Sequence, residues 1–277
     1  MPELAWDRLP AVGSGHPAVR RYLRLKRSGA GDDRFCTLQG AWAVQAALDA
    51  SVPVVAAFAC PELVRGPTVT TILSAVGEGG AALFRVSERT MRRMTERDGP
   101  DGLAAIGRPR PARLADVGLS GPSRVVVAAG VSLPGNLGTI IRCADGAGAD
   151  AVLVTESHVR LSHPTLVKAS MGTVFSVPVV ACGATEALRW LRQHRFHLVA
   201  AAPDAELSYG AVRYPERTAI VVGSERLGLD DLWSSAADER VSIPMLGQAD
   251  SLNVGHAVAV LLYHALHQQE PDRPARS

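Results

Sequence analysis

Three short polar stretches in the last quarter of the chain carry residues that could do chemistry. They are Gly223-Ser-Glu-Arg-Leu-Gly228, Val241-Ser-Ile-Pro-Met245 and Asp250-Ser-Leu-Asn-Val254. The first follows the apolar run Ala219 to Val222, so it predicts a glycine-flanked acidic turn at a strand end, where α/β proteins commonly bind small ligands. The second predicts a short strand that ends at Pro244, and the third predicts a helix that begins near Ser251. We therefore expect two strand-end loops and one helix start to converge on a single pocket.

A fourth stretch, Asn136-Leu-Gly-Thr-Ile-Ile-Arg142, combines an amide and a guanidinium with helical periodicity. Its apolar side chains share one side of a helix predicted from about Leu137 through Ala147, which leaves Arg142 off the apolar stripe. The last helix also has a buried face, whose positions are Val254, Ala257, Val258, Leu261, Leu262 and Ala265. Simpler roles stay open for the polar residues: Asn136 as a helix cap, Arg142 as a surface arginine, Glu225 as a solvated turn residue and Ser251 as an N-cap.

Helices and strands alternate along the whole chain, which indicates an α/β fold. We expect a small α/β domain over residues 1–113, a linker over 114–122 and a second α/β domain over 123–277. In the second domain, predicted strands at 124–129, 151–154 and 197–201 alternate with helices, so the sheet should be largely parallel. The pattern also predicts a strand over 174–180, and either a helix or a strand over 69–76.

Charge is distributed unevenly although the net charge is only +2. Residues 1–113 hold 16 Lys and Arg against 11 Asp and Glu, whereas residues 114–277 hold 13 against 16. The excess concentrates in a predicted helix over 16–27, whose basic residues are Arg20, Arg21, Arg24, Lys26 and Arg27. Such a basic half suits contact with a nucleic-acid phosphate backbone, and a solvated helix face without a ligand is the alternative.

Several classes of protein do not fit the sequence. No apolar run reaches the length of about 18 residues that a membrane span needs, and the N-terminal residues lack a secretion signal. The four cysteines show no C-x-x-C spacing, so free thiols in a reducing cytoplasm are expected. A dinucleotide-binding domain is disfavoured because Gly135-Asn-Leu-Gly138 is not a G-x-G-x-x-G turn. The pairs His194/His197 and His264/His267 have metal-compatible spacing without a carboxylate or cysteine beside them, so no metal is expected.

Taken in order, these motifs resemble the SpoU-type (TrmH-like) family of S-adenosylmethionine-dependent RNA ribose 2′-O-methyltransferases, within the SPOUT superfamily. The resemblance rests on Asn136-Leu-Gly-Thr-Ile-Ile-Arg142, Gly223-Ser-Glu-Arg-Leu-Gly228 and Ile243-Pro-Met with Ser251-Leu-Asn253, and it covers roughly residues 123–268. Lys168-Ala-Ser-Met-Gly172 is also similar to the family. The resemblance implies a small α/β substrate-binding domain followed by a C-terminal α/β domain with a deep trefoil knot, and a homodimer.

The resemblance also implies roles for single residues. Those implied to line S-adenosylmethionine are Gly223, Ile243, Leu252, Ala201, Ala202 and Gly228. Arg142 corresponds to the catalytic arginine, and we favour it as an organiser of phosphate and hydroxyl because arginine holds its proton too tightly to be a good base; a general-base role is the alternative. Asn136 and Glu225 would orient Arg142, with Glu225 as its anionic partner, and Ser251 and Asn253 would hold loop and substrate.

The sequence departs from the family at Ala129 and Leu133, where members often have Asp, at Cys143, where many have Thr, and at Lys168, where many have Arg. The basic N-terminal half favours 23S ribosomal RNA over tRNA as the substrate, and the stretch Gln248-Ala-Asp-Ser-Leu-Asn253 is similar to members that confer antibiotic resistance. A tRNA 2′-O-methyltransferase, a base-methylating relative and a non-catalytic RNA-binding factor with the same fold are the alternatives.

Overall fold

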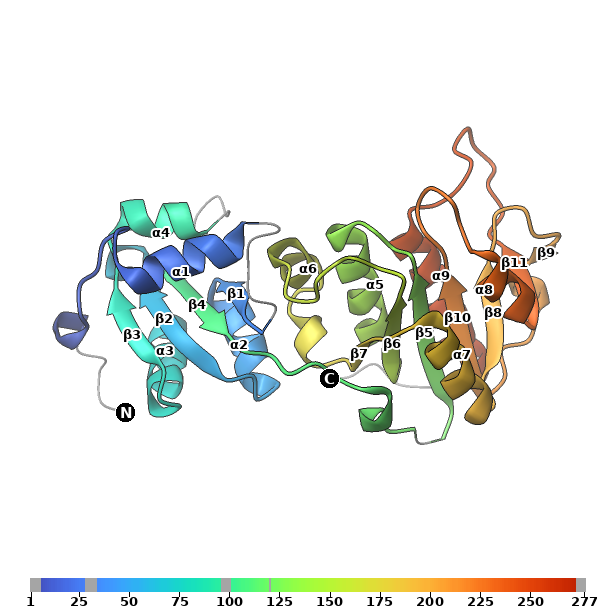
Figure 1. Ribbon diagram of the computed structural model, residues 1–277, viewed down its shortest axis with the longest axis horizontal. Coiled ribbons are helices and arrows are strands. Elements are labelled where there is room, and N and C mark those ends of the chain that lie inside the picture. The colour runs from blue at the N-terminus through green and yellow to red at the C-terminus, as the bar shows by residue number, and fades with distance from the viewer. Residues whose placement is uncertain (1–5, 28–33, 96–100, 120, 273–277) are drawn as a thin grey trace. The chain divides into compact units, whose positions relative to one another are not determined.

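The computed structural model describes residues 6–27, 34–95, 101–119 and 121–272. The chain divides into two compact units, which are Met1–Arg110 with Arg160–Ser176, and Pro111–Val159 with Val177–Ser277 (Figure 1). A segment from the middle of the second half thus belongs to the first unit, and nothing in the sequence pattern separated it from 123–277. No helix in the described ranges is long and apolar enough to cross a membrane.

The first unit is built on a small mixed sheet with the strand order β1-β4-β2-β3. The strands are β1 (Cys36–Gln39), β2 (Val54–Ala59), β3 (Ala82–Arg85) and β4 (Leu103–Gly107). Strand β4 pairs antiparallel with β1 and β2, while β2 and β3 are parallel. The sequence pattern predicted no element for β4, which glycines and prolines flank, yet it lies in the centre of the sheet.

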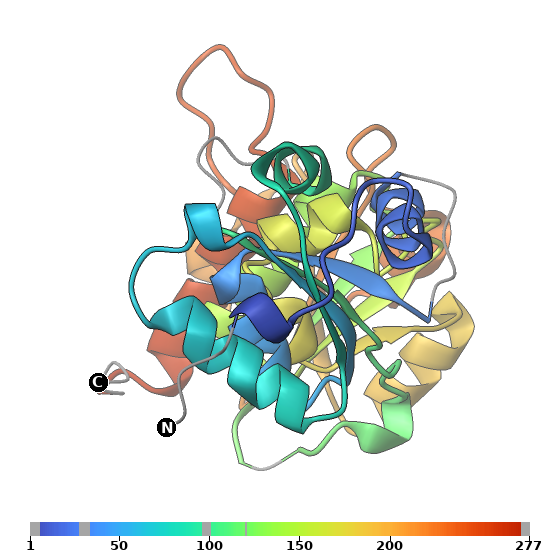
Figure 2. The same ribbon diagram turned by 90° about the vertical axis from the view of Figure 1, so that its left-hand side faces the viewer.

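Helices cover both faces of this sheet, as Figures 1 and 2 show. They are α1 (Pro17–Lys26), α2 (Ala41–Asp49), α3 (Thr68–Glu78), α4 (Glu88–Met94) and, from the later segment, α6 (Pro164–Ala169). The face of Phe58 and Ile106 packs against α1 and α4. The opposite face packs against α2 and α3, and Val167 of α6 joins that core. The stretch 69–76, left open by the sequence, is therefore helical.

The second unit contains, within the described residues, seven strands in the order β7-β6-β5-β10-β8-β11-β9. The strands are β5 (Ser123–Ala129), β6 (Ala151–Thr155), β7 (Val179–Ala181), β8 (His197–Ala201), β9 (Leu207–Ser208), β10 (Arg217–Val222) and β11 (Glu239–Ser242). Every neighbouring pair is parallel, which confirms the prediction of a largely parallel sheet.

Two helix pairs sandwich the parallel sheet. Helices α7 (Ala184–Gln193) and α8 (Asp231–Ala236) cover one face, where Trp190 and Trp233 enter the core. Helices α5 (Pro134–Gly146) and α9 (Val254–Gln269) pack on each other and on the opposite face. The predicted apolar stripes of α5 and α9 are buried, with Val254 and Ala257 at the partly exposed margin.

The predicted strand over 174–180 is wrong. Thr173–Phe175 forms a 3-10 turn, and only Val179–Ala181 pairs with the sheet. Gly172 has a left-handed φ of 77°, which turns the chain, and Pro178 has no N–H to give to a ladder. Val174 and Phe175 pack against the core of the first unit instead.

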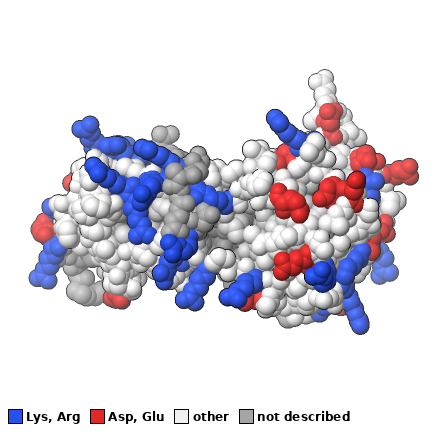
Figure 3. Space-filling view, viewed as in Figure 1, with Lys and Arg blue, Asp and Glu red and all other residues white. Residues whose placement is uncertain are grey.

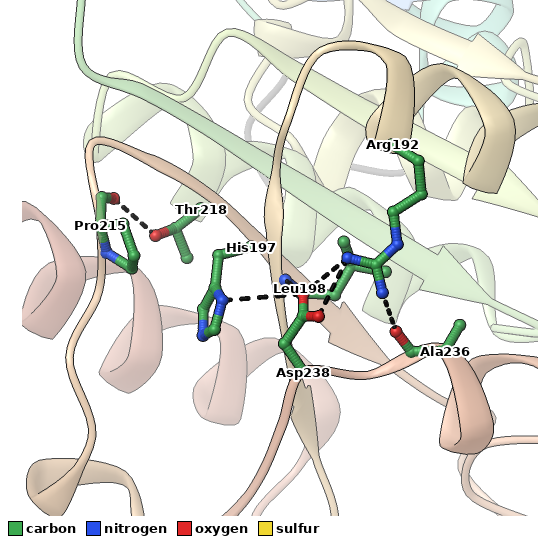
Figure 4. A network of polar contacts seen from close by, with 7 residues as sticks. All are labelled: Arg192, His197, Leu198, Pro215, Thr218, Ala236 and Asp238. Atoms are coloured by element: carbon green, nitrogen blue, oxygen red, sulfur yellow. Dashed lines mark hydrogen bonds and ion pairs between the residues drawn. The ribbon is translucent and has the colours of Figure 1, made fainter.

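A polar cluster fixes the amino end of β8 (Figure 4). The Asp238 carboxylate accepts hydrogen bonds from Arg192 Nη1 and from the Leu198 amide, each at 2.8 Å. Burial would raise the pKa of Asp238, but these bonds outweigh it and hold the pKa below its usual range. His197 Nδ1 lies 3.7 Å from the same carboxylate, and His194 Nδ1 lies 2.9 Å from the Trp190 carbonyl, so both rings have structural neighbours.

A buried arginine ties the end of α9 to the start of β5. The Arg124 side chain is only 1% exposed, and its guanidinium reaches Glu270 Oε1 at 2.8 Å and Gln269 Oε1 at 2.6 Å. The Arg124 amide donates to Asp150 at 2.9 Å, which anchors the same strand end. A buried cation needs such partners, because desolvation without them is costly.

Glu270→Ala is expected to destabilise the protein by about 2 kcal/mol, because it leaves the Arg124 guanidinium with Gln269 but without its counter-ion. Urea unfolding followed by circular dichroism measures the change. Asp204→Ala, which removes the exposed ion pair with Arg240 in the same unit, is the matched control and should leave the midpoint unchanged. Equal midpoints for Glu270→Ala and the wild type would contradict this role of Arg124.

Candidate functional site

The carboxyl ends of β5, β10, β8 and β11 meet at one edge of the parallel sheet. Gly223 directly follows β10, Ile243 directly follows β11, and Ala201 ends β8. The Ala202 amide donates to the Val241 carbonyl at 2.9 Å, which keeps these neighbouring strand ends level. The structure therefore brings together four of the six residues predicted to line the cofactor.

The turn after β10 explains two glycines of the motif. Ser224 and Gly228 exchange backbone hydrogen bonds of 2.9 and 3.0 Å, which close a tight hairpin. A Cβ at Gly223 would overlap the backbone of Gly228 and Leu229, and Gly228 has a left-handed φ of 67°. Close approach of the backbone excludes a side chain at Gly223, and the left-handed φ disfavours one at Gly228, as expected for a glycine-flanked turn.

Glu225, within this hairpin, binds the loop that follows β5. Its carboxylate accepts hydrogen bonds from the Ser132 amide at 3.2 Å, the Ser132 hydroxyl at 3.1 Å and the Leu133 amide at 3.3 Å. Asn136 Nδ2 adds a fourth bond, at 2.8 Å. The anion thus caps the amino end of α5, where the helix dipole favours negative charge.

Asn136 continues this chain of hydrogen bonds to the third motif. Its Oδ1 accepts from Asn253 Nδ2 at 2.9 Å, and Asn253 Oδ1 accepts from the Gly255 amide at 2.9 Å. Glu225, Asn136 and Asn253 therefore connect the loop after β10, the start of α5 and the start of α9. This network bridges β5 and β10, the neighbouring strands at which the strand order reverses, where open α/β sheets bind ligands.

The network also determines the ionisation of Glu225. Burial would raise the pKa of this carboxyl, but hydrogen bonds from Asn136 and Ser132 outweigh it and hold the pKa below the usual 4.5. A carboxylate whose pKa is lower in the folded than in the unfolded protein stabilises the fold at pH values above its unfolded pKa. This contribution is lost as the pH falls through the folded pKa. Glu225 is thus an anion at neutral pH.

Arg142 is exposed, as predicted, but it is not the partner of Glu225. In the described part of the chain no ion pair joins the two side chains, and the carboxylate is taken up by donors from residues 132–136. Six residues separate Asn136 from Arg142, which places them about 9 Å apart along α5 and on different sides of it. Within one chain, the expected pairing of Glu225 with Arg142 is therefore not formed.

The remaining predicted residues lie in the loop before α9, which projects from the sheet edge in Figures 1 and 2. Asn253, not Ser251, caps α9, so the helix begins at Val254. Ser251 is exposed two residues earlier, and Leu252 is 36% exposed between them. The cap role considered for Asn136 is also wrong, because the N-cap of α5 is Leu133 and Asn136 lies in the first turn.

One contributor to the site was not predicted from the sequence. Ser132 gives Glu225 both its amide and its hydroxyl. The signal that could have found it is its place in the turn directly after a buried strand, three residues past Ala129 and before Pro134.

A parallel α/β sheet with hydrogen-bonded loops at its switch point defines the class of this unit: an α/β ligand-binding domain. Residues 123–263 match the family model described as the SpoU rRNA Methylase family, and the chain belongs to this family. The prediction of the family is confirmed.

Relatives and solved structures agree with this assignment. The 23S rRNA (adenosine(1067)-2′-O)-methyltransferase of Streptomyces azureus is 36% identical over 167 residues, which are 60% of this chain and 61% of that relative. The crystal structure of an RNA 2′-O ribose methyltransferase matches with a TM-score of 0.82 and 36% identity, over 93% of this chain and 98% of the other. An AdoMet-bound rRNA methyltransferase from Sinorhizobium meliloti matches with a TM-score of 0.83 and 28% identity, over 93% and 97%.

Asn136→Asp is expected to destabilise the protein by about 1 kcal/mol at pH 7, because it places a second carboxylate against the largely exposed Glu225. The deficit should shrink as the pH falls toward about 5, since one of the two carboxyls then takes up a proton and can donate to the other. Thermal unfolding of variant and wild type across this pH range measures it. Asn136→Ala, the control, should lose stability without the pH-dependent recovery, and a deficit for Asn136→Asp that stays constant with pH would refute the contact.

Proposed function

We propose that the protein transfers the methyl group of S-adenosylmethionine to a ribose 2′-hydroxyl of 23S ribosomal RNA. The observation that carries the proposal is the hydrogen-bonded network of Glu225, Asn136 and Asn253, which joins the three family motifs at one sheet edge. The relatives named as 23S rRNA 2′-O-methyltransferases supply the substrate class and the reaction. The reaction takes place in the cytoplasm, where bacterial ribosomal RNA is modified.

The residues at the sheet edge fit S-adenosylmethionine. Gly223 leaves backbone where a Cβ has no room, and Ile243, Ala201 and the partly exposed Leu252 offer apolar contact. Gly228 and Ala202 hold the loops behind them through backbone hydrogen bonds. When bound, the cofactor supplies an electrophilic methyl group on a sulfonium.

The protein's own residues then hold the reacting ribose. Arg142 binds the phosphate beside the 2′-hydroxyl and fixes the direction of that hydroxyl through its guanidinium donors. Asn136 and Asn253 hold the loops that surround the sugar, with Glu225 as the anion that positions Asn136. Ser251, exposed beside them, binds substrate.

The site is completed in a homodimer. Arg142 lies on a different side of α5 from Asn136, so one chain does not direct both residues to the same point. A second copy related by a two-fold axis would bring its Arg142 to the network of the first. The return of the chain after β11 to pack α9 on α5 and β10 supports the deep trefoil knot expected of the family.

The first unit binds the RNA through its basic face. Figure 3 shows Lys and Arg gathered on the first unit, where α1 and α4 contact each other. The Lys26 ammonium donates to the Arg93 carbonyl at 3.2 Å, and the Arg21 guanidinium stacks 4.1 Å from the centre of the Phe35 ring. The residues proposed to contact phosphates are Arg20, Arg21, Arg24, Lys26 and Arg27. These contacts position the RNA without reading its sequence.

Methylation of 23S rRNA and of tRNA transcripts by the purified protein, with radiolabelled S-adenosylmethionine, tests the function. We expect label in 23S rRNA, recovered in alkali-resistant dinucleotides because a 2′-O-methyl group blocks cleavage at that ribose. Label in alkali-sensitive nucleotides would indicate a base methyltransferase. Cofactor binding by calorimetry without label in any RNA would favour a non-catalytic RNA-binding factor. If ribosomes that carry the methylated 23S rRNA are protected against an antibiotic, the protein would be a resistance enzyme. The Streptomyces relatives make this role worth testing.

Arg142→Ala is expected to lower kcat by about 100-fold or more with unchanged affinity for S-adenosylmethionine, because a charge aligned with the reacting phosphate and hydroxyl is lost. Single-turnover methylation and calorimetry measure the two quantities. Arg142→Lys should recover little of the rate, since an ammonium does not form the bidentate contact. An Arg142→Ala protein with the wild-type rate would exclude the residue from the reaction.

Replacing Arg20 and Arg24 together by Gln is expected to weaken RNA binding and to reduce the slope of log affinity against log salt by about 1.5, because two phosphate contacts are removed. Filter binding at four salt concentrations gives the slope. Arg213→Gln, an exposed arginine of the second unit, is the control. Identical slopes in all three proteins would place the RNA on another surface.

A further inference from the structure

The first unit contains a pocket that the reaction described above does not use. Its wall includes Thr37 and Gln39 from β1, Trp42 from α2, and Val167, Lys168 and Met171 from the segment around α6. Its cavity volume is about 100 Å³, and it is partly open to solvent. Strand β1 is an edge strand, so this pocket lies where one side of the sheet has no further strand within the described residues.

The polar group that marks this pocket as a binding site is the hydroxyl of Thr37. The residue is only 2% exposed, and among the described residues its hydroxyl has no hydrogen-bond partner. A buried hydroxyl without a partner is unfavourable, and a water molecule or a ligand can satisfy it. Gln39, two residues along the same strand, shares its face and places an amide in the same wall.

The other walls suit a flat aromatic ring. Trp42 is partly buried and offers an indole ring, while Val167 is buried and apolar. Lys168 is exposed beside them and supplies a positive charge. Met171 is held at a left-handed φ of 51°, uncommon outside glycine, and the following Gly172 at 77° lets the chain approach Trp42 and Ala46.

We propose that this pocket binds one unstacked nucleobase of the RNA substrate. Trp42 stacks on the base, the Thr37 hydroxyl and the Gln39 amide bind its polar edge, and Lys168 binds the adjoining phosphate. Proteins read single-stranded RNA by this combination of aromatic stacking and hydrogen bonds to base edges. A peptide or a lone phosphate fits less well, because the wall combines one cation with an aromatic ring and an apolar floor. The proposal rests on the proposed function, which makes RNA the partner of this unit.

The test uses the full-length protein, 23S rRNA transcribed in vitro and the four nucleoside monophosphates. Trp42→Leu is expected to weaken RNA binding by about 10-fold or more, because stacking on the base is lost. Thr37→Val should weaken it by about 3- to 10-fold while raising the unfolding temperature, since it removes a buried hydroxyl without a partner. Thr37→Ser, which keeps the hydroxyl, should restore RNA binding. Calorimetry with S-adenosylmethionine should give the wild-type Kd for every variant.

A purely structural Thr37 would produce a stability change without any change in RNA affinity, and that result would overturn the proposal. Equal RNA affinity for folded Trp42→Leu and wild type would overturn it as well. Tight binding of a nucleoside monophosphate that RNA does not displace would show that the pocket serves a free nucleotide and not the substrate. These outcomes are separate from failure of the proposed function, in which the wild type would methylate no RNA while the pocket variants could still differ in nucleotide binding.

Discussion

The hydrogen-bonded chain from Glu225 through Asn136 to Asn253 is the constraint on which the site depends. Each of these side chains comes from a different segment, and Asn136 is 89 residues from Glu225 and 117 residues from Asn253 in the sequence. Four hydrogen bonds from neutral donors stabilise the Glu225 carboxylate, without a cation among its partners in the described part of the chain. Arg142 is exposed and, within the described part of one chain, does not pair with Glu225, which is compatible with the contact to a substrate phosphate that we propose for it.

Contacts at both ends of the parallel sheet hold the segments that carry this network. At the carboxyl edge, the close approach of Gly223 to Gly228 folds the loop that presents Glu225. At the opposite edge, Arg124 fastens the end of α9, the helix whose first turn begins at Asn253. Helix α9 is thus anchored at both of its ends, at Asn253 through Asn136 and at Glu270 through Arg124.

Much of this could be predicted from the sequence, because helical stripes and strand runs are local signals. The buried faces of α5 and α9 followed from residue spacing, and Arg142 was placed outside them. Strand β4 was missed because its identity depends on pairing with β1 and β2 and its flanks contain glycine and proline. The donors to Glu225 within one chain were missed for a similar reason: a carboxylate can accept from any donor, and only the strand order determines which loop lies beside it.

The segment Arg160–Ser176 belongs to the first unit, although its position in the sequence lies within the second half of the chain. Residues 168–172 lie within the stretch matched by the family model, yet Val167 and Phe175 pack into the core of the first unit. There α6 contacts β1, an edge strand that would otherwise offer unpaired backbone groups to other chains. Gly172 is required for this contact, since a Cβ would come within 2.6 Å of Ala46. The same chain segment that carries a family motif thus completes the sheet edge, and with it the pocket beside Thr37 and Trp42.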